Sequence, residues 1–133
     1  MPQYSEILLD HFQHPRNLGE LETANAVGDS SNQTCGDLMR LFLNIKNGTV
    51  TEAQFMTLGC AAAIATGSML TEMIKGKRLE DALKVRNKEV ADALGGLPDE
   101  KIHCSVLAEQ ALASAVANWK KHPNGKPKGK SGK

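Results

Sequence analysis

Hydrophobic and polar positions alternate most regularly between residues 38 and 58 of this 133-residue chain. The alternation sets one group of side chains, Leu41, Leu43 and Ile45, against another, Arg40, Phe42 and Asn44. A period of two residues is typical of a strand with one buried face. Asn47-Gly48 follows, the strongest short signal for a type I′ hairpin turn. The pattern therefore predicts a hairpin whose second strand runs from Thr49 to about Leu58.

Before this hairpin, the pattern predicts a short helix and then a loop. Ser5 is suited to cap the helix, and Pro15 ends it because proline disfavours helical geometry in the residue before it. The apolar face of this helix is expected to contain Ile7, Leu8, Leu9 and Phe12. Residues 17–34 are rich in Gly, Asn, Ser and Thr, which predicts a loop with one edge strand around Ala24 to Gly28.

After the hairpin, the pattern becomes helical. Residues 59–77 are apolar nearly all round, which predicts a buried helix that ends at Lys75 and Gly76. A more polar, amphipathic helical stretch covers 79–94, and a final helix runs from about Cys104 to Lys120. Strands come mostly first and helices after them. This order favours an α+β fold, a small antiparallel sheet of about three strands with helices packed on one face.

The charge of the chain separates a body from a tail. The net charge is +1, but six of the 16 Lys and Arg residues lie in 120–133, and no acid follows Glu109. Residues 1–119 then carry 10 basic and 15 acidic groups, a balance of −5. We expect one folded domain over 1–120 and a basic, disordered tail over 121–133. An acidic body is a poor match to a nucleic-acid-binding domain.

Other classes of protein are disfavoured by the three cysteines and by the hydropathy of the chain. An odd number of cysteines without a secretory signal argues against a disulfide framework. No segment approaches the roughly 20 apolar residues that span a bilayer. We expect a cytoplasmic protein without membrane contact, whose thiols are either inert core residues or chemically active.

The hairpin predicts where two of the thiols lie. With a two-residue loop at 47 and 48, the numbers of paired residues add up to 95, and so do those of Cys35 and Cys60. Without a bulge, the two cysteines face each other at the open end of the hairpin. Asp37 lies two residues from Cys35 and shares its face. The weak point is length, since such strands would exceed the usual five or six residues.

Cys60 and Cys104 also fall at the predicted starts of two helices, where free N–H groups favour the thiolate. His103 precedes Cys104 and is a borderline ligand or proton source. Taken singly, each cysteine is more often a small buried residue, Asp37 a turn residue, and His103 a solvated side chain. A core-filling role, however, gives no reason for three cysteines to lie at element boundaries.

Three segments carry a resemblance to a known family: "TCGDLMRL", "FMTLGCAAAIATGSMLTEMIKGK" and "GGLPDEKIHCSVLAEQAL". Together with "YSEILLDHFQHPRNLG" they resemble the IscU/NifU-type iron–sulfur cluster scaffold proteins over about residues 3–120. The resemblance implies a scaffold or carrier and not a turnover enzyme. On it a [2Fe–2S] cluster would be assembled and then transferred to recipient apoproteins.

The resemblance also implies roles for single residues. Cys35, Cys60 and Cys104 would bind iron or the cluster, Asp37 would assist as a ligand or in release, and His103 would be an optional ligand. Cys104 would be the main persulfide acceptor from a cysteine desulfurase of the IscS/NifS type. Zinc would be able to occupy the same site. Ferredoxin-like or frataxin-like partners are further expectations, and a homodimer is left open.

The chain departs from the family pattern at several positions. Gln33 stands where a proline is usual, and Ala61 where glycine is frequent. Many bacterial members carry LPPVK, which an Hsp70-type chaperone reads, whereas residues 97–101 are LPDEK. The two acids argue against that chaperone and leave Lys101 in place.

Two other functions compete with a cluster scaffold. One is a relay that carries persulfide on Cys104 while zinc holds Cys35 and Cys60. The other is a hydrolase with Cys104 as nucleophile and His103 as base. The hydrolase is disfavoured because neighbouring side chains are expected to diverge and no third orienting group is apparent.

Overall fold

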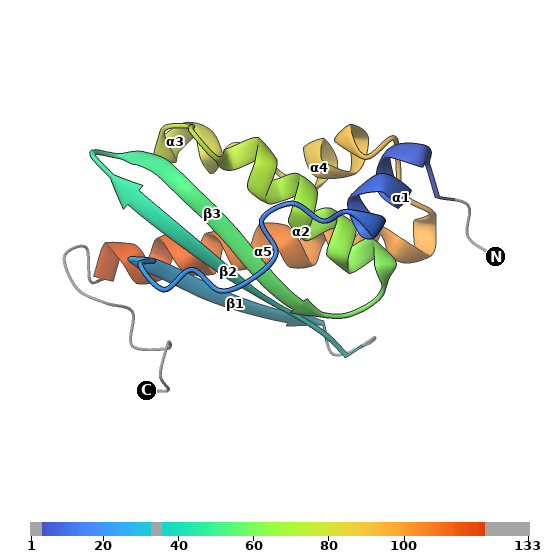
Figure 1. Ribbon diagram of the computed structural model, residues 1–133, viewed down its shortest axis with the longest axis horizontal. Helices are drawn as coiled ribbons and strands as arrows, with labels where there is room; N and C mark the ends of the chain where they lie inside the picture. Colours follow the sequence, from blue (N-terminus) through green and yellow to red (C-terminus); the bar gives the residue numbers. More distant parts are fainter. Residues whose placement is uncertain (1–3, 33–35, 122–133) are drawn as a thin grey trace.

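The computed structural model describes residues 4–32 and 36–121 and shows an α+β fold with one three-stranded antiparallel sheet. The strands are β1 (Ala26–Asn32), β2 (Asp37–Lys46) and β3 (Thr49–Leu58), in the order β1-β2-β3 (Figure 1). The helices are α1 (Glu6–Gln13), α2 (Ala61–Ile74), α3 (Leu79–Ala82), α4 (Asn87–Ala93) and α5 (Ile102–Lys121), with a 3-10 turn η1 (Asp99–Lys101) before α5. The predicted fold class is confirmed.

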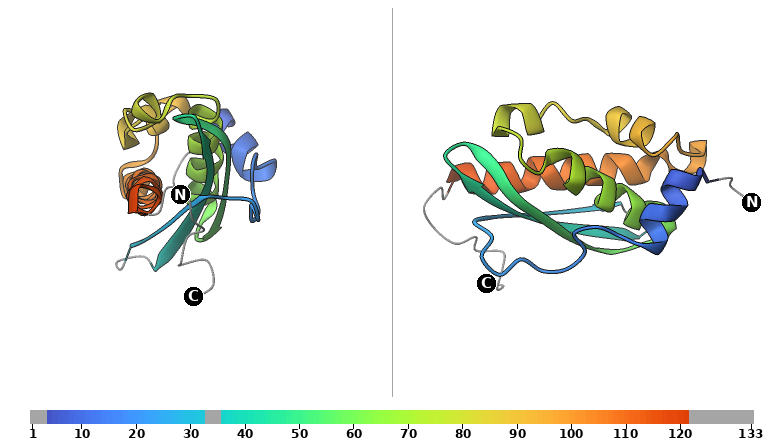
Figure 2. Two further views of the ribbon diagram at one scale, coloured as in Figure 1. Left: turned by 90° about the vertical axis from the view of Figure 1, so that its left-hand side faces the viewer. Right: turned by 45° about the horizontal axis from the view of Figure 1, so that its top comes forward.

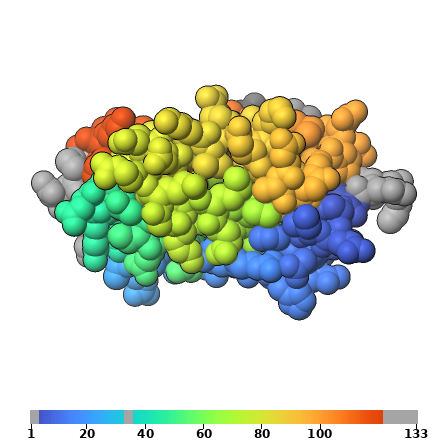
Figure 3. Space-filling model, turned by 90° about the horizontal axis from the view of Figure 1, so that it is seen from above, coloured from blue at the N-terminus to red at the C-terminus, as the bar shows by residue number. Residues whose placement is uncertain are grey.

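Helices α2 and α5 cover one face of the sheet, as the two views in Figure 2 show. Figure 3 shows this side from above, with α2, α3, α4 and the start of α5 forming a continuous surface beside α1. The large buried side chains beneath them include Phe55, Leu41, Leu43, Leu70 and Leu107. The opposite face is covered in part by the segment before β1, where Leu21 and Ala24 pack on Val27 and Phe42.

Strand β1 lies directly against α5. A Cβ atom at Gly28 would come within 2.1 Å of the backbone nitrogen of Ala115, so the strand and the helix approach closely because this residue has no side chain. Asn118 Nδ2 also donates to the carbonyl of Val27, at 2.7 Å. These contacts fix the long α5 along the sheet, and its first turn is thereby held at the open end of the hairpin.

The hairpin turn forms as the sequence predicts, with φ of 53° at Asn47 and 75° at Gly48. The predicted register is wrong beyond the first two pairs. Lys46 pairs with Thr49 and Ile45 with Val50, but Asn44 pairs with Glu52. Thr51 is the extra residue, and its hydroxyl donates to the carbonyl of Asn44 at 3.0 Å.

The bulge shifts the sum of paired residue numbers from 95 to 96, and the ladder ends at the pair Leu38–Leu58. The direct pairing of Cys35 with Cys60 therefore does not follow from the hairpin. Cys35 itself lies outside the described residues, as do Gln33 and the tail from 122 onward.

Two helical predictions need correction. The stretch 79–94 forms two short helices, α3 and α4, with Arg86 as the N-cap of the second. Helix α1 has Ser5 as its N-cap, as predicted, but its buried residues are Leu8 and His11, while Ile7 and Phe12 remain substantially exposed. His11 is a polar residue in the last turn of α1, yet it is buried. Its Nδ1 lies 2.7 Å from Ser68 Oγ on α2.

Candidate metal and thiol site

Three segments that are distant in sequence bring a carboxylate and two thiols together. Asp37 begins β2, Cys60 is the N-cap of α2, and Cys104 lies in the first turn of α5. Cys60 Sγ lies 3.8 Å from Cys104 Sγ and 3.9 Å from Asp37 Oδ2. Cys104 Sγ lies 4.0 Å from the same oxygen. The three atoms therefore form a nearly equilateral triangle.

The size of this triangle fits three ligands around one metal ion. With metal–sulfur bonds of about 2.3 Å and tetrahedral angles, two sulfur ligands are separated by about 3.8 Å. The two thiols already stand at that separation, and the carboxylate oxygen needs to move only a few tenths of an ångström. Thiolates are also the soft donors that iron–sulfur clusters use. The donor set thus suits zinc, ferrous iron or one edge of a cluster.

Cys60 is free to face this site because it does not cap its own helix. An N-cap side chain usually accepts a hydrogen bond from the first turn. Cys60 has the extended backbone of an N-cap, with φ −82° and ψ 179°, but its side chain makes no capping bond. The thiol is therefore left to point at Cys104 and Asp37, at the positive end of the α2 dipole.

His103 extends the site on the side of Cys104. Its Nε2 lies 3.7 Å from Cys104 Sγ, and ligand atoms of Asp37, His103 and Cys104 all lie within 4.8 Å of one another. The expectation that the neighbouring side chains diverge is wrong. Among the described residues, however, no hydrogen bond orients the His103 ring from its other side, so a catalytic triad is not formed.

The two thiols differ in their exposure to solvent. Cys104 is fully buried, Asp37 is 8% exposed, and Cys60 is half-buried. Burial, together with the nearby Cys60, raises the pKa of the Cys104 thiol far above its ordinary value. Without a metal, Cys104 is therefore held as the neutral thiol, and a bound cation would be needed to stabilise its thiolate.

Lys101, the last residue of the LPDEK segment, also lies at the site, although it was not among the predicted site residues. Lys101 Nζ lies 3.7 Å from Cys60 Sγ. The pKa of Lys101 is raised, chiefly by Cys60, against the opposing effect of burial; Tyr4 and Cys104 add to the increase. The signal available in the sequence was position alone, since Lys101 is two residues before His103.

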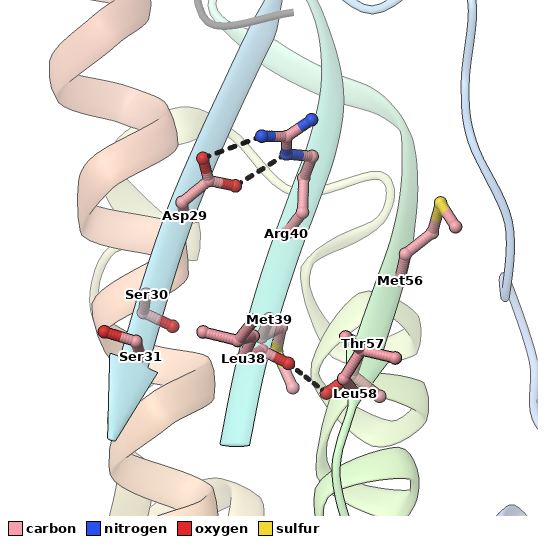
Figure 4. A pocket seen from close by; sticks show the side chains of 9 residues that line it. All are labelled: Asp29, Ser30, Ser31, Leu38, Met39, Arg40, Met56, Thr57 and Leu58. Carbon is pink, nitrogen blue, oxygen red and sulfur yellow. Dashed lines mark hydrogen bonds and ion pairs between the residues drawn. The ribbon is translucent and has the colours of Figure 1, made fainter. Parts of the chain in front are cut away.

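A separate groove lies beside the site, over the ends of the three strands (Figure 4). It encloses about 520 Å³. Its lining is mixed: an Asp29–Arg40 ion pair stands at one end, and Leu38, Met56 and Leu58 are 46%, 47% and 71% exposed. Its lining includes Leu38, next to Asp37 in sequence, but neither of the two described thiols, so the groove is adjacent to the candidate metal site and not part of it.

Comparison with known proteins identifies the family of this chain. The family model for the NifU-like N terminal domain matches residues 3–126. This chain belongs to that family. The IscU/NifU resemblance read from the sequence is thereby confirmed, and the family is one of iron–sulfur cluster assembly scaffold proteins.

Two relatives illustrate the family. The chain is 52% identical over 116 residues to the iron–sulfur cluster assembly scaffold protein IscU 1 of Archaeoglobus fulgidus, covering 87% of this chain and 76% of the relative. It is 48% identical to the nitrogen fixation protein NifU of Azotobacter chroococcum over 90% of this chain, but that match spans only 40% of NifU.

A solved structure from the same field of function has a similar fold. A Fervidobacterium islandicum protein assigned to iron–sulfur cluster assembly for the SUF system is similar at a TM-score of 0.70 and 25% identity. The alignment covers 85% of this chain and 96% of that one. Within the described part of the chain, no helix combines the length and apolar character required to cross a membrane.

Proposed function

We propose that this protein is a scaffold on which a [2Fe–2S] cluster is assembled and from which the cluster passes to recipient apoproteins. The observation that carries the proposal is the triangle of Asp37, Cys60 and Cys104, whose sides of 3.8 to 4.0 Å match ligands around one metal ion. Cys35, which lies outside the described residues, and His103 are the proposed further ligands. The cluster is cargo here and not a resident cofactor.

A mixed donor set supports release of the cargo. Stable iron–sulfur clusters usually have four thiolates. This chain has three cysteines, so at least one position must be taken by Asp37, His103 or a partner's group. Hard oxygen ligands bind iron of a sulfide cluster less tightly than thiolates do. We infer that Asp37 is the ligand that gives way during transfer.

We also propose that Cys104 accepts sulfur from a cysteine desulfurase. In this step the Cys104 thiolate attacks the outer sulfur of the donor's persulfide, Cys104 becomes the persulfide, and the donor leaves as its thiolate. Cys104 is fully buried and its pKa is raised. Sulfur transfer should therefore occur only after a metal has bound or after the site has opened around α5.

Anaerobic reconstitution with ferrous iron, cysteine and a cysteine desulfurase tests the proposal. We expect the wild-type chain to develop the charge-transfer absorption of a [2Fe–2S] cluster and to lose it on addition of an apo-ferredoxin. Cys60→Ser should abolish cluster formation. Ala61→Ser is the matched control, because it adds a hydroxyl to the next residue and leaves all thiols in place.

Each other outcome has a defined meaning. A normal cluster on Cys60→Ser would show that Cys60 is a core residue and not a ligand. Persulfide on Cys104 without uptake of iron would contradict the scaffold and support the relay. Mass spectrometry of the anaerobic sample separates these cases, because persulfide adds one sulfur atom to the chain.

A further inference from the structure

Lys101 stands at the metal site without being one of its ligands. It is the last residue of η1, directly before α5, and its ammonium group reaches across to the start of α2. The contact joins Lys101 Nζ to Cys60 Sγ at 3.7 Å, a distance suited to an N–H···S hydrogen bond. Lys101 thus links the segment that carries Cys104 to the segment that carries Cys60.

Three arginines of the described residues are engaged elsewhere. Arg16, Arg40 and Arg86 form short ion pairs with carboxylates, with nitrogen–oxygen distances of 2.6 to 2.7 Å. No other lysine or arginine in 4–32 and 36–121 makes a hydrogen bond with Asp37, Cys60 or Cys104. Within that part of the chain, Lys101 is therefore the positive charge available to the site.

A metal centre here would carry excess negative charge. A divalent ion with two thiolates and one carboxylate has a net charge of 2 − 3 = −1, and a further thiolate makes it −2. A partly buried anionic centre is stabilised by a cation beside it. Hydrogen bonds to cluster sulfurs also adjust the reduction potential of iron–sulfur centres.

We propose that Lys101 is a positioning residue for this centre: its ammonium donates to Cys60 Sγ, holds that sulfur in the triangle, and offsets the negative charge of the metal–thiolate set. The inference rests on the proposed function for the identity of the cargo, but not for the binding of a metal ion. The LPDEK segment then has a role at the site through Lys101, which follows its two acids.

The test compares three variants by titration with Co²⁺ alone under anaerobic conditions. Lys101→Met keeps a chain of similar length without charge, and Lys101→Arg keeps the charge. Lys46→Met is the matched control, since it removes an exposed lysine from the turn end of the hairpin. Thermal unfolding of each metal-free chain checks that the fold is unchanged.

We expect Lys101→Met to weaken Co²⁺ binding about fivefold, the range expected for one partly exposed charge contact. Lys101→Arg should restore wild-type affinity, and Lys46→Met should match the wild type. The difference should shrink at high ionic strength because the contact is near solvent. On a reconstituted cluster, Lys101→Met should make the reduction potential more negative.

Two results would overturn the inference: a Lys101→Met chain with wild-type affinity and potential, or a Lys101→Arg chain as weak as Lys101→Met. Failure of the proposed function is a different result. A wild-type chain that binds Co²⁺ but assembles no cluster refutes the scaffold, and the Co²⁺ series still decides the role of Lys101.

Discussion

The two ends of the β2–β3 hairpin show how differently one sheet can be specified. At the turn end, Asn47 and Gly48 adopt the positive φ angles of a tight turn, and the two residues are adjacent in sequence. At the open end, Asp37, Cys60 and Cys104 meet from three separate segments. The turn is a local property of a dipeptide, whereas the open end exists only when the whole fold is complete.

The ends also differ in what they contribute. The turn end has favourable backbone geometry and exposed side chains, so it acts on stability. The open end holds a buried carboxylate and a buried thiol with long, weak contacts to each other. Buried polar groups with weak contacts cost stability when no metal is bound. Substitutions at the two ends should therefore separate stability from metal binding.

The largest effect is expected from Gly59→Ala at the open end. A Cβ at this position would come within 2.9 Å of both Asp37 Cγ and Ala63 Cβ. Overpacking of this kind costs about 1 to 3 kcal/mol, and the displaced Asp37 should also weaken Co²⁺ binding. Urea unfolding and Co²⁺ titration measure the two effects. In the Gly59→Ala/Asp37→Ala double variant the loss of stability should be less than additive; additive losses would contradict the assigned contact.

The next effect concerns release. Asp37→Ala removes the hard ligand and should slow transfer of the cluster to apo-ferredoxin by about tenfold, the low end of effects seen when groups around a metal centre are removed. Stopped-flow absorption measures the rate. Asp29→Ala, on the same sheet but ion-paired with Arg40, should transfer normally. Unchanged or faster transfer from Asp37→Ala would remove Asp37 from this role.

Gly48→Ala should act on the turn end alone. Gly48 has φ of 75°, and a Cβ there would contact nothing within 4 Å, so the cost is conformational and not steric. We expect a loss of about 1 kcal/mol in the free energy of unfolding. Co²⁺ affinity, measured on the same sample, should stay at the wild-type value. A weakened metal site in this variant would show that the two ends are coupled.

The smallest expected effect is a pH dependence of the stability, and it comes from His11 in α1, away from both ends of the hairpin. Burial, together with Arg16, lowers the pKa of His11, against opposing effects of Asp10 and Glu72. The unfolded chain then binds the proton more readily than the folded one, so stability is complete above about pH 6.5 and declines as the pH falls below it. Urea unfolding at pH 7.5 and 5.5 measures the decline. His11→Gln should reduce it; an equal decline in this variant would assign it to other groups.

Sequence reasoning predicted the elements that depend on local signals. The Asn47-Gly48 turn, the Ser5 cap and the end of α2 at Lys75 all follow from residues next to one another. The bulge at Thr51 was missed because nothing in the sequence marks which residue is left unpaired. The burial of His11 was missed because it depends on Ser68, 57 residues away.

The residues of the candidate site were predicted in part. Asp37, Cys60, His103 and Cys104 were identified by residue type and by family resemblance, and the described residues bring these four together. The argument from strand pairing that linked Cys35 to Cys60 was wrong, since it required a register without a bulge. The contact of Lys101 depends on how η1 meets α2, which a linear pattern cannot show.

The length of α5 has a practical consequence for anyone who attaches something to this protein. Cys104 lies in its first turn and Lys121 ends it 17 residues later, which corresponds to about 26 Å along the helix axis. Figure 1 shows this helix running along the molecule. A label, bead or fused module attached at the Lys121 end of α5 would therefore lie far from the thiols. A linker would need about eight extended residues to span that distance.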